Sequence, residues 1–420
     1  MSGGAGAGLL LAWALWPRTY AHNLSAGEGE HVFNAFLKIA NDGRVLVAVP
    51  QAELGQGSWT ALPQILADEL GADWRTIGVE PAPIGPLYAN RLLAEGEDDG
   101  SFVGGTRRWR AQHFEAGSEA MLTAGSTSVR TFERPLREAG AGARALLMKA
   151  AAAHWGVEWE TLDTAAGFVV DGTRRLSFAE LAEAAADEEL PEHLPIRAGI
   201  DNRLTGQPLP RLDLPAKVDG SAPFAGDIRL PDMVYASVRA GPTEDSRLAR
   251  WKRNKGLAVP GVFGAFDAPG WVGCIGSNWW AANKGVEALD PVWDVPHPPV
   301  SSESLDSALI GALGRDEGTR VYSRGDLADA FAGGHVLRGH YSAGPAASAP
   351  LETLTATARL AGGELEIWAP TQAPGLARAA AARVAGLDEA RVTLYPTLIG
   401  GGYGRKLETR AIEQAAMLAV

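Results

Sequence analysis

The chain has 420 residues, of which 50 are acidic and 38 are basic, and a formal net charge of −12. A chain of this length forms roughly two to four domains, and 46% hydrophobic with 21% charged residues is typical of a packed fold. The acidic balance argues against a basic nucleic-acid-binding face, so we expect no nucleic-acid partner. The single cysteine, Cys274, excludes an internal disulfide framework and a Cys-rich zinc or iron–sulfur site in this chain.

Residues 1–31 are predicted to be an export-signal-like or irregular N-terminal segment. They contain an apolar run at 8–16, shorter than the roughly 20 residues that a membrane-spanning helix needs. The run resembles the apolar core of an export signal, but no Lys or Arg precedes it. Two interpretations stay open: export to the periplasm or cell envelope, and a buried strand in a cytoplasmic protein.

The pattern of residues 32–186 predicts an α+β domain. Hydrophobic residues alternate on both sides of Asn41-Asp42-Gly43, which predicts a hairpin with its turn there. The loop Gly55-Gln56-Gly57 follows, and a second loop at 123–128 precedes a long helix that Ser126 or Thr127 could cap. Hydrophobic spacing predicts the other elements: helices at 62–70, 129–153 and 176–186, and a strand at 77–80.

The middle of the chain changes character twice. Residues 187–212 are rich in Pro, Glu and Asp, and we interpret them as a linker that crosses the surface. Short β-like runs separated by Pro and Gly at 213–300 predict a compact α+β domain with a βαβ-like end. Residues 296–320 carry little hydrophobic pattern and are expected to be a loop. The predicted elements are strands at 234–238, 259–266 and 272–275, a helix at 279–289 and an extended segment at 291–294.

Residues 301–420 are predicted to form the third folded block. Its expected elements are strands at 353–360, 364–368 and 392–395, and helices at 375–385 and 407–420. The last helix is expected to expose Ile412, Ala416 and Leu418 unless a partner covers them.

Three loops rich in glycine or hydroxyl groups, at 55–57, 125–128 and 400–404, each precede a helix pattern. One such loop alone is usually a plain tight turn. Three of them favour a single extended ligand with several anionic or carbonyl groups, because N–H groups at such turns can face an anion. None matches a P-loop or a dinucleotide fingerprint, and Ser126 is not in a nucleophile elbow.

Four motifs occur here in the same order as in molybdenum hydroxylases. They are Val49-Pro50-Gln51-Ala52-Glu53-Leu54-Gly55-Gln56-Gly57, Ala124-Gly125-Ser126-Thr127-Ser128, Trp368-Ala369-Pro370-Thr371-Gln372 and Gly400-Gly401-Gly402-Tyr403-Gly404-Arg405. With them the chain resembles the N-terminal part of a large subunit of the xanthine dehydrogenase/aldehyde oxidase family. The similarity is to the branch of isoquinoline 1-oxidoreductase and membrane-linked aldehyde dehydrogenase. Residues 205–213 and 215–220 resemble the entry to the family's hammerhead domain.

The resemblance implies an α+β architecture with a hammerhead-type α/β domain at 213–300. That domain would be inserted beside partial molybdopterin-binding α+β domains, one at 32–186 and a truncated one at 301–420, with 187–212 as the linker. The implied cofactor is molybdopterin cytosine dinucleotide with molybdenum. Its phosphates and pterin would contact Gly55, Gln56, Gly57, Gly125, Ser126, Thr127 and Ser128.

The same resemblance places Gln372 and the last glycine loop at the metal's ligands. Gln372 would donate a hydrogen bond to a molybdenum oxo ligand without adding charge. Tyr403 stands where the family usually has Phe, and its ring is expected to pack. Glu352 fits a family pattern that a His usually precedes, and Ser348 takes that place here. The residues of the last loop implied in cofactor binding are Gly401, Gly402, Tyr403, Gly404 and Arg405. Arg405 and Lys406 are expected to face either the anionic part of the cofactor or a carboxylate surface.

The family chemistry hydroxylates a carbon beside nitrogen, or oxidises an aldehyde, with oxygen from water and with a glutamate as base. That glutamate lies in a Gly-Val-Gly-Glu type motif, which does not occur in residues 1–420, so no catalytic or metal-ligating residue is assigned here. Electrons would pass to iron–sulfur clusters on a separate small [2Fe-2S] subunit. The other implied partners are a second chain that carries the C-terminal half and a c-type cytochrome.

Three functions therefore stay open. The ordered motifs favour a component of a molybdenum-dependent oxidoreductase. The helix pattern that continues up to residue 420 favours a truncated, non-catalytic remnant. The three glycine loops by themselves favour a simple anion- or nucleotide-binding module.

Overall fold

The computed structural model describes residues 23–95, 120–197, 202–297, 300–315, 318–319 and 324–420. Strands and helices are mixed throughout, in agreement with the predicted α+β class. The chain divides into two compact units, of which the second is Arg229–Ala346 and the first comprises the residues before and after it. The apolar run at 8–16 lies outside the described residues, and the predicted domain boundaries stay predictions.

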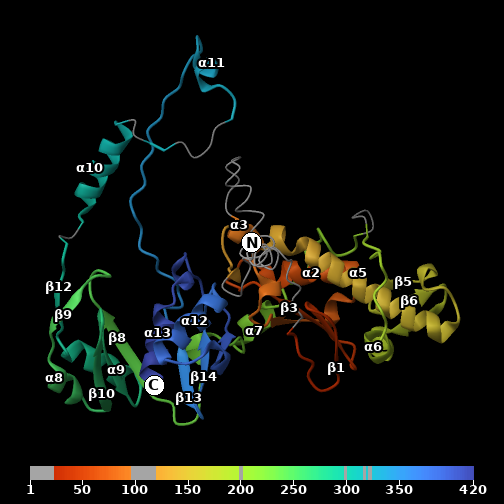
Figure 1. Cartoon of the computed structure of the whole chain (residues 1–420), viewed down its shortest axis with the longest axis horizontal. Coiled ribbons are helices and arrows are strands. Elements are labelled where there is room, and N and C mark those ends of the chain that lie inside the picture. Colours follow the sequence, from red (N-terminus) through yellow and green to blue (C-terminus); the bar gives the residue numbers. More distant parts are fainter. Residues whose placement is uncertain (1–22, 96–119, 198–201, 298–299, 316–317, 320–323) are drawn as a thin grey trace, which may run out of the picture. The chain divides into compact units, whose positions relative to one another are not determined.

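The first unit contains a four-stranded sheet in the order β1-β2-β3-β4, of which β1 and β3 are labelled in Figure 1. The predicted hairpin is confirmed, because β2 and β3 pair antiparallel and Gly43 between them has a φ of 87°. β3 and β4 are parallel and are joined by α2, so the three form a βαβ unit. The elements are β1 (Glu30–Asn34), β2 (Leu37–Ala40), β3 (Val45–Val49), α2 (Ser58–Leu70) and β4 (Ile77–Pro81).

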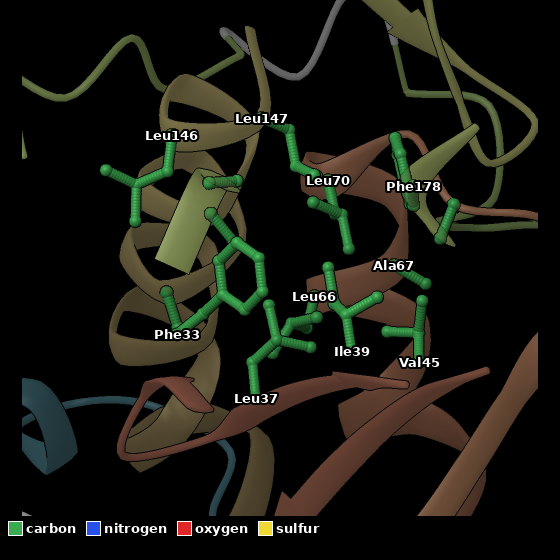
Figure 2. Close-up of a cluster of buried hydrophobic side chains, with 14 of the residues drawn as sticks. Phe33, Leu37, Ile39, Val45, Leu66, Ala67, Leu70, Leu146, Leu147 and Phe178 are labelled. Atoms are coloured by element: carbon green, nitrogen blue, oxygen red, sulfur yellow. The ribbon is translucent and has the colours of Figure 1, made fainter. Parts of the chain in front are cut away.

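Helices α5 (Ser128–Trp155) and α6 (Phe178–Ala186) complete the core of this sheet, as predicted. Figure 2 shows the apolar side chains that these elements bring together, with Leu37 and Ile39 of β2 facing Leu66 of α2 and Leu147 of α5. All four side chains are buried, and burial of such a residue contributes about 1.5–3 kcal/mol. This core fixes the position of the residues that follow β3.

Helices α2 and α5 approach closely at Gly140, where a Cβ would lie 2.7 Å from the carbonyl oxygen of Leu66 and 2.9 Å from Cβ of Glu69. Replacing Gly140 with alanine is therefore expected to lower the free energy of unfolding by about 1–3 kcal/mol, although alanine is the better helix former. Urea denaturation measures the change. Gly142→Ala is the matched control, because a Cβ at position 142 would meet only the flexible ends of two side chains, Leu190 at 3.2 Å and Leu194 at 3.8 Å. Equal stability of the two variants would contradict the close packing.

Three short strands between α5 and α6 were not predicted from the sequence, because runs of three or four residues give too little alternation. They form a sheet in the order β5-β6-β7. Their bounds, with those of two short helices in the same unit, are β5 (Asp163–Ala165), β6 (Phe168–Asp171), β7 (Arg174–Ser177), α3 (Arg91–Glu95) and α7 (Leu214–Asp219).

The C-terminal residues of the first unit form a second βαβ arrangement. Strands β14 and β15 are parallel with α12 between them, and β13 pairs antiparallel with β14. The elements are β13 (Thr357–Ala361), β14 (Glu364–Ala369), α12 (Pro374–Ala385), β15 (Val392–Pro396) and α13 (Arg410–Ala419). The predicted exposure of α13 is wrong for two residues: Ile412 is 3% and Ala416 0% exposed, because both pack on α12 and the sheet. The chain itself covers this face.

The second unit carries the sheet β10-β11-β8 and the pair β12-β9, with α9 packed on the sheet. Its predicted strands and helix are confirmed, but the expected loop at 296–320 is wrong because α10 lies within it. That helix starts from a capping box between Ser301 and Ser304 and buries no residue, so hydrophobic spacing could not indicate it. The elements are β8 (Tyr235–Ala240), β9 (Arg247–Arg250), α8 (Arg253–Leu257), β10 (Val262–Ala268), β11 (Trp271–Gly276), α9 (Trp279–Ala288), β12 (Val292–Asp294), α10 (Ser302–Leu313) and α11 (Leu327–Phe331).

Candidate functional site

Three of the four motifs lie directly beyond the carboxyl ends of parallel strands in the first unit. Residues 50–57 follow β3, residues 370–373 follow β14, and residues 397–404 follow β15. Ligands in sheets with parallel strands usually bind at this edge. The fourth motif, residues 124–128, leads into α5. Hydrogen bonds join the four motifs through their own residues or through residues directly beside them, and one of these bonds connects residues 249 positions apart.

Gln372 connects three of the loops. Its side-chain Nε2 donates to the carbonyl oxygen of Thr123 at 2.7 Å, and the backbone N of Thr123 donates back to the Gln372 carbonyl at 2.9 Å. Its own backbone N donates to the carbonyl oxygen of Lys406 at 2.9 Å. Gln372 is only 8% exposed, so these bonds fix a buried side chain.

The Oε1 atom of Gln372 is buried and has no hydrogen-bond partner among the described residues. A Cβ on Gly402 would lie 2.8 Å from this oxygen, so glycine at 402 keeps the space beside it open. Thr123 O is an acceptor and holds the NH2 end of the amide, which makes the unpartnered atom an acceptor. Donation to a metal oxo ligand, as predicted, would have to use the second N–H. Gln372 Oε1 is instead suited to accept a hydrogen bond from an N–H or O–H group of a ligand, because leaving this buried oxygen unpaired costs about 1–3 kcal/mol.

The first glycine loop closes around the buried carboxylate of Glu53. Its Oε1 accepts from the backbone N of Gly55 at 2.8 Å and of Gly57 at 3.0 Å. The two N–H groups that were predicted to face phosphate are therefore occupied. Both glycines have positive φ, 100° and 92°, and a Cβ on either would meet nothing within 4 Å, so a ligand can still approach the backbone closely. Gln56 also bonds within the loop, to Ala52, Leu54 and Ser58.

The second loop, residues 124–128, is anchored by the side chain of Asn90, which is fully buried. Asn90 Nδ2 donates to Thr127 Oγ1 at 2.7 Å, and Thr127 is itself 5% exposed. Thr127 is the N-cap residue of α5, but its side chain accepts no bond from the helix; its hydroxyl donates to Ala124 O instead. Ser128 donates to Gln51 Oε1 at 2.8 Å and so connects this loop to the first motif. The two residues left exposed are Gly125 and Ser126.

The last glycine loop presents Tyr403 to solvent. Tyr403 is 77% exposed and has a φ of 48°, so the expected packing of its ring is wrong. The positive φ of Gly401 and Gly404, 89° and 87°, turns the backbone sharply on both sides of it. Arg405 is likewise exposed and its Nε pairs with Glu408 at 2.9 Å. These two side chains therefore lie at the surface of the loop rather than beneath it.

Lys406, next in the chain, is 1% exposed. Its Nζ donates to Glu352 Oε2 at 3.1 Å and to Thr353 O at 3.0 Å. The same Glu352 oxygen accepts from the backbone N of Gly400 at 2.9 Å. A buried ion pair thus fixes the start of the glycine loop, and Lys406 faces a carboxylate rather than a ligand.

Arg211 approaches the first loop from a distant part of the chain. Its Nη2 donates to Glu53 Oε1 at 3.0 Å and its Nη1 to Gly55 O at 2.8 Å. It also forms two bonds with Asp213, at 2.9 and 2.8 Å. The Arg211 guanidinium, together with Lys217, holds the pKa of Asp213 down to about 2. Neither Arg211 nor the buried Asn90 and Glu53 was predicted as a site residue, because their roles depend on long-range contacts.

Among the described residues, no group of three or more His, Cys, Asp or Glu side chains could hold a metal ion. In the same part of the chain, no helix combines the length and apolar character that crossing a bilayer requires. Cys274 lies buried in β11 of the second unit, where desolvation raises the pKa of its thiol to about 11. It remains a thiol at neutral pH and is not suited to metal binding.

The sequence matches two family models, each described as a molybdopterin cofactor-binding domain, over residues 314–420 and 6–82. Isoquinoline 1-oxidoreductase subunit beta of Brevundimonas diminuta is 28% identical over 440 residues, covering 91% of this chain and 52% of that protein. Membrane-bound aldehyde dehydrogenase (pyrroloquinoline-quinone) of Gluconacetobacter polyoxogenes is 26% identical over 413 residues, covering 93% and 49%. The crystal structure of quinoline 2-oxidoreductase from Pseudomonas putida 86 superimposes with a TM-score of 0.38 and 18% identity, covering 49% of this chain and 32% of that chain.

The chain spans about half the length of these two curated relatives. The matched segments contain the first glycine loop, Gln372 and the last glycine loop, which the fold brings together. The chain therefore belongs to the family of molybdenum hydroxylase large subunits.

Proposed function

We propose that the chain is the N-terminal, cofactor-binding part of a molybdenum-dependent hydroxylase or aldehyde dehydrogenase large subunit. The cofactor would be molybdopterin cytosine dinucleotide with molybdenum, and the substrate an N-heterocycle or an aldehyde, oxidised with oxygen from water. The observation that carries the proposal is the unpartnered Oε1 of Gln372, which is buried beside Gly402 where two motif loops meet. The two substrate classes are those that the names of the relatives indicate.

The residues present suit such a ligand in two ways. Gln372 Oε1 would accept a hydrogen bond from a donor of the cofactor, which a pterin amino or ring N–H group supplies. Gly55 and Gly57, with open space where a Cβ would be, would let the cofactor lie directly on the backbone. The exposed Gly125 and Ser126 would offer short polar contacts in the same manner. The other residues proposed to contact the cofactor are Gln56, Thr127, Ser128, Gly401, Gly402, Tyr403, Gly404 and Arg405.

When bound, the cofactor would supply the redox chemistry. The residues of this chain would bind and orient it. Gln372 and Gly402 would set its position, while the buried pair of Lys406 and Glu352 would hold the loop that carries Gly402. Because those groups are 1–11% exposed at the side chain, they would also keep water away from one side of the cofactor.

The remaining half of the relatives' length would complete the site, in the same or another polypeptide. We propose that it brings the base, and that a small [2Fe-2S] subunit takes the electrons, with a c-type cytochrome as a further acceptor. A hammerhead-type arrangement at 213–300 and a periplasmic or cell-envelope location belong to the same proposal. The motivation is the match to large subunits of this family.

Replacing Gln372 with methionine tests the proposal, since methionine keeps the volume but removes both the free acceptor and the N–H that donates to Thr123 O. The pterin recovered per chain is expected to fall about tenfold, because a buried hydrogen bond to a ligand is worth about 1–3 kcal/mol. Pterin is measured by fluorescence after denaturation and oxidation, and molybdenum by elemental mass spectrometry. Gln414→Met is the matched control, because Gln414 is also 8% exposed but lies on α13.

A wild-type chain that holds neither pterin nor molybdenum, even when it is produced with the rest of a large subunit, would overturn the proposal. Tight binding of a simple cytidine nucleotide without pterin would instead support a nucleotide-binding module. A folded chain that binds none of these ligands would support the non-catalytic remnant.

A further inference from the structure

The first glycine loop binds an anion that belongs to the chain itself. Glu53 is 1% exposed, and its carboxylate accepts from the backbone N of Gly55, Gly57 and Trp59. Its Oε2 lies 3.3 Å from the hydroxyl of Ser58, which also donates to it. This arrangement is the one that glycine loops at helix N-termini offer to bound anions.

Glu53 thereby replaces a missing helix cap. The N-cap residue of α2 is Gly57, which has no side chain to accept bonds from the first turn. The carboxylate supplies that acceptor through Trp59 N at 2.9 Å, and its negative charge suits the N-terminus of a helix. The shape of the loop therefore depends on a charge buried within it.

A buried carboxylate needs a cation, and Arg211 is the cation that contacts this one. The two residues are 158 positions apart in the sequence. Arg211 belongs to residues 202–213, here named the strap, which lies along α2. Asp68 of α2 accepts from the backbone N of Arg203 at 2.7 Å and of Leu204 at 2.8 Å. Further bonds hold the strap in place: Gln64 donates to Leu204 O and Gln207 O, Trp74 donates to Pro210 O, and Leu212 N donates to Thr60.

We propose that Glu53 and Arg211 are positioning residues. Their ion pair, here called the lock, holds the glycine loop with its amides directed at Glu53, and the strap places Arg211 in that pair. Arg211 clamps the loop twice, once at the carboxylate and once at Gly55 O. The backbone N–H groups of Gly55 and Gly57 donate to Glu53. The opposite side of the loop, where a Cβ on either glycine would meet nothing within 4 Å, stays open to a ligand. The inference about the lock concerns this chain alone, and its consequence for cofactor loading rests on the proposed function.

Hydrogen exchange of the amides in residues 53–60 tests the lock directly in the full chain. In Arg211→Ala, protection of the Gly55 and Gly57 amides is expected to fall about tenfold or more, because Glu53 loses its cation. Arg211→Lys keeps a charge but cannot span three acceptors, so it is expected to restore protection only in part. Arg75→Ala is the control: its side chain is 88% exposed and pairs with Asp73 outside the loop, so exchange in 53–60 should not change.

The two proposals can fail separately. If Arg211→Ala exchanges like the wild type at 53–60, the lock is overturned whatever the pterin content. If the wild type holds pterin, the pterin content per chain is expected to be about tenfold lower in Arg211→Ala and unchanged in Arg75→Ala. If the wild type holds no pterin but the exchange result is as expected, the proposed function fails and the lock stands. Glu53→Gln is a second variant. Its side-chain NH2 group would face the backbone N–H groups of the loop, so the backbone amides of Gly55 and Gly57 should again exchange faster.

Discussion

Replacing Lys406 with methionine is expected to lower the free energy of unfolding by about 3–5 kcal/mol. Lys406 is 1% exposed, and its ammonium is the cation that contacts the carboxylate of Glu352. Methionine fills the same space, but it leaves Glu352 charged and nearly buried, with only 11% of its side chain exposed. Urea denaturation followed by tryptophan fluorescence measures the shift of the unfolding midpoint.

The neighbouring residue supplies the control. Arg405 has a side chain that is 46% exposed and pairs with the exposed Glu408, so Arg405→Met should change stability by less than about 1 kcal/mol. Combining Lys406→Met with Glu352→Gln should recover part of the loss, since the second change removes the unpaired charge. If Lys406→Met unfolds at the wild-type urea concentration, the pair does not hold the glycine loop.

Replacing Gly402 with alanine is expected to act on the cofactor site itself. The backbone at 402 is not left-handed, so alanine is allowed there, but its Cβ would lie 2.8 Å from Gln372 Oε1. It would also lie 3.2 Å from a methyl group of Leu54 and from Cγ of Lys406. Overpacking of this kind costs about 1–3 kcal/mol, which corresponds to about a tenfold or larger loss of bound pterin. Pterin and molybdenum per chain are the measurements.

Gly226→Ala is the matched control for Gly402→Ala, because its Cβ would meet nothing within 4 Å and its φ is not positive. This variant should keep the wild-type pterin content. A Gly402→Ala chain that binds as much pterin as the wild type would place the ligand away from Gln372. The result would then contradict the site, while the fold of the unit would remain as described.

The elements of the βαβ units were predictable from the sequence because their signals are local. The turn at Asn41-Asp42-Gly43 identifies the β2–β3 hairpin, and the helical spacing at 62–70 identifies α2, whose last residue it gives correctly although the helix begins earlier, at Ser58. Exposed or very short elements were missed for the opposite reason. Helix α10 buries nothing, and β5 has only three residues, so neither has a hydrophobic pattern to detect.

The motifs of the candidate site could be identified in the sequence, but the contacts and the exposure of their side chains could not. Tyr403 was expected to pack and is exposed. Lys406 faces the carboxylate of Glu352, one of its two expected partners, but its near-complete burial was not predicted. Tyr403 itself has a positive φ and lies between Gly401 and Gly404, whose φ values are also positive, so the loop turns sharply just before Lys406. Composition and spacing carry no information on which of the two side chains is buried.

By itself the sequence determined that this is an acidic α+β chain with four ordered motifs, three of which lie in segments that match molybdopterin cofactor-binding domains. It also determined which loops follow which strands, because strand and turn signals extend over a few neighbouring residues. Only the tertiary structure decided that Glu53 occupies its own glycine loop, that Arg211 neutralises it, and that Gln372 keeps a free acceptor beside Gly402. Each of these depends on atoms tens or hundreds of residues apart that meet only when the strands and helices pack around a common core.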